Sequence, residues 1–122
     1  MPRNTPPTVH RWADLPHDRP MPLLERWRIV GEHAMISHVL LRKGCVVPMH
    51  AHDNEQFACV LTGELRFVLN AENGPDRREV VVRAGEVLLL PANVPHAAEA
   101  IQETLVLDIF SPPSERTGID RD

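Results

Sequence analysis

Three histidines stand where imidazole side chains can act together on a metal ion. One residue separates His50 from His52, and in an extended strand residues i and i+2 point to the same face. His96 follows a stiff turn at 91–95 that begins and ends with proline, and such a turn can fix the direction of the side chain. Neutral imidazole binds divalent transition metals at metal–nitrogen distances of about 2.1 Å. The pattern predicts one metal site built from these histidines.

A further ligand is expected just after the histidine pair, and two residues compete for the position. Strand alternation places Gln56 on the face of His50 and His52 and turns Glu55 away, but a β-bulge after His52 would exchange the two. A carboxylate from Glu55 would build the two-histidine, one-carboxylate set of non-haem iron oxygenases. The neutral Gln56 leaves the metal more positive and favours a Lewis-acid role. Both possibilities remain open from the sequence.

A lone acid near the C-terminus is the candidate for proton transfer. Asp108 lies on an otherwise apolar segment and shares a face with Val106 and Phe110. A carboxyl group directed into a protein interior is costly unless it is hydrogen-bonded or used. Desolvation would raise its pKa toward neutral pH, where it can exchange protons. His38, within a predicted strand, is a further candidate for lining the same cavity.

Short apolar segments must position these side chains. Most are bounded by glycine, proline or asparagine turns, and no long apolar stripe of period 3.6 appears. The predicted strands are 26–30, 34–41, 56–61, 64–69, 78–82, 86–90 and 103–110. Two of them carry consecutive apolar residues, at 80–82 and 88–90, which predicts burial on both faces. This pattern indicates an antiparallel β-sandwich or barrel.

The composition fits one soluble domain. The chain has 122 residues, 25% of them charged, a net charge of −4 and 4% aromatic residues, which argues against a nucleic-acid partner. No apolar run approaches the roughly 20 residues that span a membrane, and the first residues lack a secretory core, so we expect no membrane partner and a cytoplasmic location. Cys45 and Cys59 are predicted to be free and buried. We divide the chain into a proline-rich arm (1–22), a barrel (23–113) and a polar tail (114–122).

Two stretches of the chain resemble the sequence motifs of the cupin superfamily. From Gly44 to Gly63 the order is glycine, five residues, HxH, an intervening ligand position and a final glycine. Residues 85–96 resemble the second motif, with its proline and final histidine in register. Asn93 replaces the usual glycine, and asparagine also tolerates left-handed backbone geometry. Ala100 stands where the motif usually has asparagine.

The cupin resemblance implies a fold, a cofactor and a partner. The fold is all-β, the cupin double-stranded β-helix or jelly-roll barrel. The cofactor is one divalent transition metal per chain (Zn, Ni, Fe, Mn or Cu), held by His50, His52, Gln56 and His96, with Gln56 in the place of the usual glutamate. The partner is a second copy of the chain in a homodimer, with the proline-rich arm crossing onto it.

The segment 107–113 resembles the closing strand of the pectin-degradation cupins, which convert unsaturated uronates into a linear keto form. This likeness implies Asp108 as the catalytic residue and Phe110 in the substrate pocket. The family arginine is replaced by Ser114, so Arg116 and Arg66 are the predicted substitutes for binding a substrate carboxylate.

The expected function is therefore that of a metal-dependent isomerase or lyase acting on a small molecule, a sugar acid, by uronate ketonisation. A non-haem iron dioxygenase and a non-catalytic metal- or ligand-binding cupin remain as alternatives.

Overall fold

The computed structural model describes residues 6–71 and 73–114, and almost all of its regular structure is β-strand. The elements are η1 (Trp12–Asp14), β1 (Leu24–Val30), β2 (Met35–Leu41), β3 (Val46–His50), β4 (Glu55–Thr62), β5 (Glu64–Leu69), β6 (Arg78–Arg83), β7 (Val87–Leu90), β8 (His96–Ala100) and β9 (Thr104–Ser111). Within the described residues, no helix is long and apolar enough to cross a membrane.

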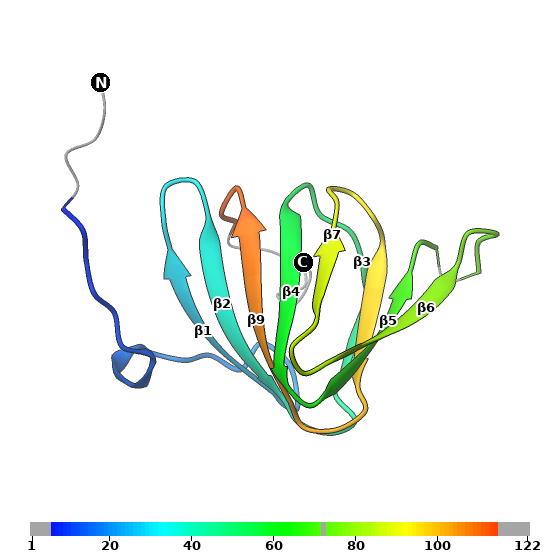
Figure 1. The fold of residues 1–122 in the computed structure, drawn as a ribbon, viewed down its shortest axis with the longest axis horizontal. Helices are drawn as coiled ribbons and strands as arrows, with labels where there is room; N and C mark the ends of the chain where they lie inside the picture. The colour runs from blue at the N-terminus through cyan, green and yellow to red at the C-terminus, as the bar shows by residue number, and fades with distance from the viewer. Residues whose placement is uncertain (1–5, 72, 115–122) are drawn as a thin grey trace.

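The strands form two antiparallel sheets that face each other as a jelly roll. The five-stranded sheet has the order β1-β2-β9-β4-β7, and the four-stranded sheet has the order β3-β8-β5-β6. Figure 1 shows the strands curving upward from a closed lower end, where β4 turns into β5. The prediction of an all-β jelly roll is confirmed.

Two strands escaped the sequence prediction, and they hold two of the three histidines. The seven predicted strands lie within two residues of the observed bounds, and 64–69 coincides with β5. The missed strands are β3, which contains Pro48, and β8, with the sequence HAAEA. Proline lacks the N–H that a strand ladder uses, and alanine has little strand preference, so both segments carry a weak strand signal.

The prediction that 80–82 and 88–90 are buried on both faces is wrong. Val87 and Leu89 keep 56% and 50% of their surface exposed, and Val80 and Val81 are only half-buried. The burial pattern of β7 alternates between exposed and more buried residues, as expected for a strand with one face toward the core and the other toward solvent. Consecutive apolar residues could not show whether the second face is covered.

The apolar core fills the closed end of the barrel. Val39, Leu41, Leu65 and Val106 are at most 3% exposed and pack in one cluster. Thr104, at 0% exposure, closes this end: its Oγ1 accepts a hydrogen bond from the Glu64 N–H at 3.0 Å and lies 2.9 Å from the Gln102 carbonyl oxygen, to which it can donate. The closed end is therefore apolar, with its polar group satisfied.

The proline-rich arm leaves the body over residues 6–11 and is tied to it from Trp12 onward, where Trp12 stacks on His38 and His17 lies against Trp27. Residues 6–11 lie exposed, and in Figure 1 this stretch runs away from the strands. Asp18 then pairs with Arg26 through two backbone hydrogen bonds of 3.0 and 2.9 Å.

The free thiol of Cys45 is buried, as predicted, whereas that of Cys59 is half-buried.

Candidate metal centre

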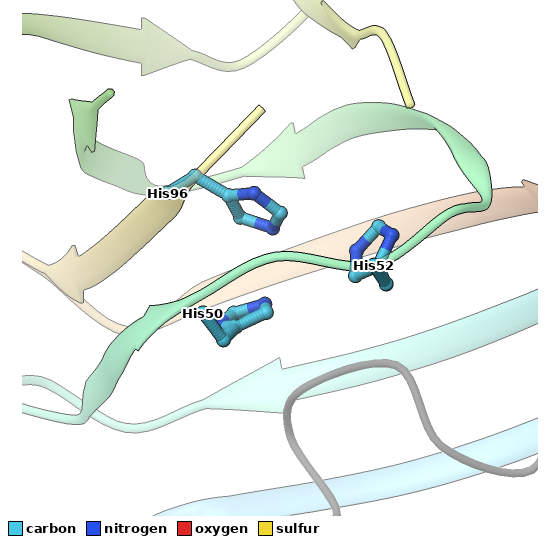
Figure 2. Close-up of side chains that lie close together, drawn as sticks. All are labelled: His50, His52 and His96. Carbon is cyan, nitrogen blue, oxygen red and sulfur yellow. The ribbon is translucent and has the colours of Figure 1, made fainter. Parts of the chain in front are cut away.

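The sheet pairing explains how two distant histidines meet. His50 ends β3 and His96 begins β8, and the two residues are direct cross-strand partners. A register irregularity between Val47 and His50 bends β3 at this point. His52 lies in the loop that follows β3, and Figure 2 shows the three imidazoles gathered at one place.

The spacing of the three rings suits a single ion. The ring centroids of His50 and His96 are 4.2 Å apart, those of His52 and His96 are 5.1 Å apart, and those of His50 and His52 are 5.7 Å apart. One ligand nitrogen from each ring lies within 4.8 Å of the other two. Two nitrogens bound to one ion at about 2.1 Å are at most about 4.2 Å apart. A small side-chain adjustment therefore brings all three onto one metal.

Backbone carbonyls fix which nitrogen of each ring is available. His50 Nδ1 lies 2.7 Å from the Pro48 oxygen, His52 Nδ1 lies 3.1 Å from the Asn54 oxygen, and His96 Nδ1 lies 2.9 Å from the Val94 oxygen. A carbonyl oxygen only accepts, so each Nδ1 carries the hydrogen and each Nε2 keeps a lone pair. Holding the second nitrogen in this way is typical of metal-bound histidine.

Gln56 supplies a fourth donor at the same place. Its Oε1 lies 3.1 Å from His52 Nε2, and its Nε2 donates to Asp108 Oδ1 at 2.9 Å. Because His52 Nδ1 carries the hydrogen, the lone pair of His52 Nε2 faces a lone pair of Gln56 Oε1. A cation bound between these two atoms would stabilise this arrangement. Glu55 is exposed, so Gln56, and not Glu55, is directed at the histidines. Three imidazoles and one amide oxygen fit a divalent transition metal.

Two asparagines hold the loops that carry the ligands. Asn54 is 1% exposed, and its side-chain amide donates to the Pro112 carbonyl. Asn93 has a φ of 68°, in agreement with the left-handed geometry expected of this position, and its N–H donates to the His52 carbonyl at 2.8 Å. This role of Asn54 was not predicted; the available signal was a polar residue between the HxH pair and an apolar strand.

Burial lowers the pKa of two of the histidines and raises that of the acid. Desolvation lowers the pKa of His50, and it lowers the pKa of His96 to about 4. Both rings are therefore neutral ligands at pH 7. Burial raises the pKa of Asp108 to about 7, although the hydrogen bond from Gln56 acts in the opposite direction.

A small hollow lies beside the ligands. It measures about 40 Å³, and its walls include His50, Gln56, His96, Asp108 and Phe110. Such a volume holds an ion and very few water molecules. The rings of Phe110 and His52 form a T-shaped pair at a centroid distance of 5.7 Å. Phe110 and Asp108 thus lie in the wall of the candidate centre.

Two predicted substrate-binding residues lie elsewhere. His38 faces outward from β2 and stacks on Trp12 at a centroid distance of 4.8 Å, because alternation points Ser37 and Val39 inward instead. Arg66 faces outward from β5 and pairs with Glu79 at 2.6 Å and Glu99 at 3.1 Å.

Neither His38 nor Arg66 lines the hollow beside the histidines. Arg116 lies outside the described residues.

Comparison with known families and structures gives consistent matches. The family described as Cupin domain matches residues 37–110. KdgF from Halomonas sp. has 22% identity and a TM-score of 0.77, with 90% of this chain and 97% of that one covered. Bacillus subtilis oxalate decarboxylase, a protein with Mn(II) centres, has 19% identity and a TM-score of 0.76, with 95% of this chain and 34% of that one covered. At these identities the two structures show a shared fold.

A curated relative matches a shorter part of the chain. The 3-hydroxyanthranilate 3,4-dioxygenase of Rattus norvegicus is 37% identical over 60 residues, which are 49% of this chain and 20% of that protein. The chain therefore spans about a fifth of the length of this relative.

Proposed function

This chain belongs to the cupin domain family, with residues 37–110 matched, and we propose from that premise that it is a metal-dependent isomerase of small sugar acids. The observation that carries the proposal is the contact of Gln56 with both His52 and Asp108, at 3.1 and 2.9 Å. The side-chain amide of Gln56 thus links the buried carboxyl group of Asp108 to the candidate metal ligand His52. A Lewis acid and a proton carrier beside each other are what keto–enol isomerisation needs.

The histidines and Gln56 are proposed to hold one divalent ion. When bound, the ion would supply a Lewis acid that polarises a hydroxyl or carbonyl oxygen of the substrate. The donor set suits Zn, Ni, Fe, Mn or Cu, because affinity alone does not select among them at a site of nitrogen and oxygen ligands.

Asp108 is proposed to move the proton. Its Oδ1 accepts from Gln56, which orients the carboxyl group and leaves Oδ2 to exchange a proton. In the proposed reaction the carboxylate removes a proton from an enol oxygen and returns one to carbon, so the substrate is isomerised and nothing is oxidised or reduced. The apolar wall around Phe110 excludes water from this transfer.

The likeness of segment 107–113 to the closing strand of the pectin-degradation cupins supports an unsaturated uronate as the substrate. The fold shared with KdgF agrees with this assignment. Asp108 and Phe110, the two residues that the likeness implies, both line the hollow beside the histidines.

The experiment is an anaerobic assay on unsaturated galacturonate that follows the loss of its ultraviolet absorbance, together with metal analysis of each protein. Wild type is expected to accelerate the loss without oxygen. Asp108→Asn should lower kcat by about 10²- to 10⁴-fold, the usual contribution of general acid–base catalysis, while it keeps its metal. Glu55→Gln is the matched control, because its carboxylate is close in sequence but exposed, and it should retain full activity.

The outcomes separate the alternatives. Metal in the wild type without turnover of the uronate would overturn the isomerase proposal in favour of a non-catalytic binding protein. Turnover that Asp108→Asn leaves unchanged would remove Asp108 from the mechanism.

A second candidate, a non-haem iron dioxygenase, is favoured by the 37% identity with 3-hydroxyanthranilate 3,4-dioxygenase over 60 residues. The exposure of Glu55 weighs against it, because no carboxylate replaces the neutral Gln56 among the described ligands. Oxygen consumption during turnover, measured with an oxygen electrode, would favour the dioxygenase; turnover without oxygen would exclude it.

We also propose that two copies of the chain associate through the outer face of β4 and β7. Phe57, Leu61, Val87 and Leu89 expose between 36% and 56% of their surface there, and a contiguous apolar patch typically marks an interaction surface. Light scattering should give about twice the 13.8 kDa chain mass. Leu89→Lys should give the monomer. Val46 lies on β3 and is about as exposed as Leu89, so Val46→Lys should leave the dimer intact.

A further inference from the structure

Gln56 can turn either end of its side-chain amide toward the histidines, and the two ends have opposite effects on a metal ion. In the structure the amide oxygen lies 3.1 Å from His52 Nε2. If the amide were turned over, its N–H group would instead donate to the lone pair of His52 Nε2. That hydrogen bond would occupy the nitrogen needed for the metal and would withdraw the amide oxygen. Metal binding therefore depends on the direction of the amide.

The carboxyl group of Asp108 decides this direction. Gln56 Nε2 donates to Asp108 Oδ1 at 2.9 Å. An ionised carboxyl group only accepts hydrogen bonds, so turning the amide over would set the Gln56 oxygen against the Asp108 oxygen. Gln56 and Asp108 are 6% and 5% exposed, and two buried acceptors without a donor between them are costly. The amide is therefore held with its nitrogen toward Asp108 and its oxygen toward His52.

The strand register builds this contact into the fold. Ala58 of β4 is the direct cross-strand partner of Asp108 on β9, and Gln56 lies two residues earlier on β4. Residues two apart on a strand share a face, and a long side chain reaches its diagonal neighbour on the adjacent strand. Both strands have a neighbour on each side within the five-stranded sheet. The position of the Gln56–Asp108 pair is therefore fixed by the sheet.

We propose that Asp108 is a positioning residue of the metal centre, which holds the Gln56 amide so that its oxygen, and not its N–H group, meets the ion. This role differs from proton transfer, because it acts through Gln56 and needs no substrate. It rests on the candidate metal centre and does not depend on the isomerase reaction. It also gives a reason for the neutral amide: Gln56→Glu would bring two carboxylates together, whereas Gln56 offers a donor to Asp108 and an oxygen to the metal.

The test is titration of the metal-free protein with Zn²⁺ in competition with a chromophoric chelator. The titration is done at pH 8, because burial raises the pKa of Asp108 to about 7 and the ionised form then prevails. Asp108→Leu removes the acceptor and should weaken Zn²⁺ binding by about 10- to 100-fold, the usual cost of losing a residue that holds a metal ligand. Asp108→Asn keeps an acceptor oxygen, so it should recover most of the affinity although it carries no charge.

Variants of Gln56 show whether Asp108 acts through the amide. Gln56→Leu removes the amide and should weaken Zn²⁺ binding through the loss of one ligand. Adding Asp108→Leu to Gln56→Leu should then cause no further loss, so the two single effects should be far from additive. Additive losses, or equal losses in Asp108→Leu and Asp108→Asn, would overturn the proposal, because the carboxylate would then act on the ion by its charge alone.

Ser37→Ala is the matched control. Ser37 is 2% exposed and is the direct partner of Asp108 on β2, but the described hydrogen bond of the Gln56 nitrogen goes to Asp108. Its Zn²⁺ affinity should equal that of the wild type, and a loss as large as that in Asp108→Leu would contradict the positioning role. The expected Zn²⁺ affinities without turnover of the unsaturated uronate would instead overturn the proposed reaction and support the positioning role.

Discussion

The two ends of the barrel differ in how their buried polar groups are satisfied. At the closed end, Thr104 is 0% exposed, and its hydroxyl both accepts a hydrogen bond and can donate one. At the metal end, one ligand nitrogen from each of the three histidines lies within 4.8 Å of the other two, and the Gln56 oxygen lies 3.1 Å from His52 Nε2. The first arrangement is complete without any further group, whereas the second is completed by a cation.

We therefore expect the closed end to contribute mainly to the stability of the fold and the metal end mainly to ligand binding. The closed end holds buried apolar side chains and the fully buried Thr104, so changes there should unfold the protein. The metal end holds groups that cost free energy in the empty fold, so changes there should remove ligand binding with smaller effects on the fold. Functional sites commonly carry such a stability cost.

The largest effect is expected from Gly63→Ala at the closed end. Gly63 has a φ of +93°, and an added Cβ would lie 2.3 Å from the Glu103 carbonyl oxygen. Positive φ and forced overpacking together should cost at least about 3 kcal/mol, measured by urea denaturation. Gly44→Ala is the control, since Gly44 has a φ of +87° but no described atom within 4 Å of the added Cβ. Similar losses in both variants would contradict the role of the close contact.

The next effect concerns the metal itself. At a free metal concentration 100 times Kd, binding should stabilise the wild type by about 2.7 kcal/mol, seen as a rise in Tm. In His50→Ala this rise should vanish and the metal content should fall to near zero. His38→Ala is the control, because His38 lies on the outer face against Trp12, and it should behave as wild type. A full metal content in His50→Ala would disprove the candidate centre.

The pH dependence of the metal-free protein should give the smallest effect. Burial raises the pKa of Asp108 from 3.8 to about 7, so between these values the folded state holds more protons and stability falls as pH rises. Desolvation lowers the pKa of His96 from 6.5 to about 4, so between these values the unfolded state holds more protons and stability rises with pH. The two slopes oppose each other, and each is at most about 1.4 kcal/mol per pH unit.

Two variants separate these opposing slopes. In Asp108→Asn, with chelator present, the free energy of unfolding should rise from pH 4 to 6.5, and in His96→Asn it should fall from pH 4 to 7. The same pH profile in both variants would show that neither burial effect operates.

The local sequence pattern was sufficient to predict the positions of most of the strands. β5 coincides with the predicted segment 64–69, because alternating apolar residues and flanking glycine and asparagine act over short range. Strands β3 and β8 were not predicted, since their pairing with each other, and not their own composition, makes them strands. The expected double burial at β7 failed because the segment itself does not show whether another layer covers its second face.

The sequence by itself determined the chemical types at the site: the HxH pair, the histidine after a proline turn, and the acid on an apolar strand. It also indicated an antiparallel β-sandwich or barrel, because strand spacing and turn residues are local properties, and the resemblance to the cupin motifs implied the jelly roll. Only the tertiary structure decided that Gln56 and not Glu55 meets the histidines, that Arg66 and His38 face outward, and that the Gln56 amide donates to Asp108. Those choices depend on register and sheet order, which arise from contacts between residues far apart in the chain.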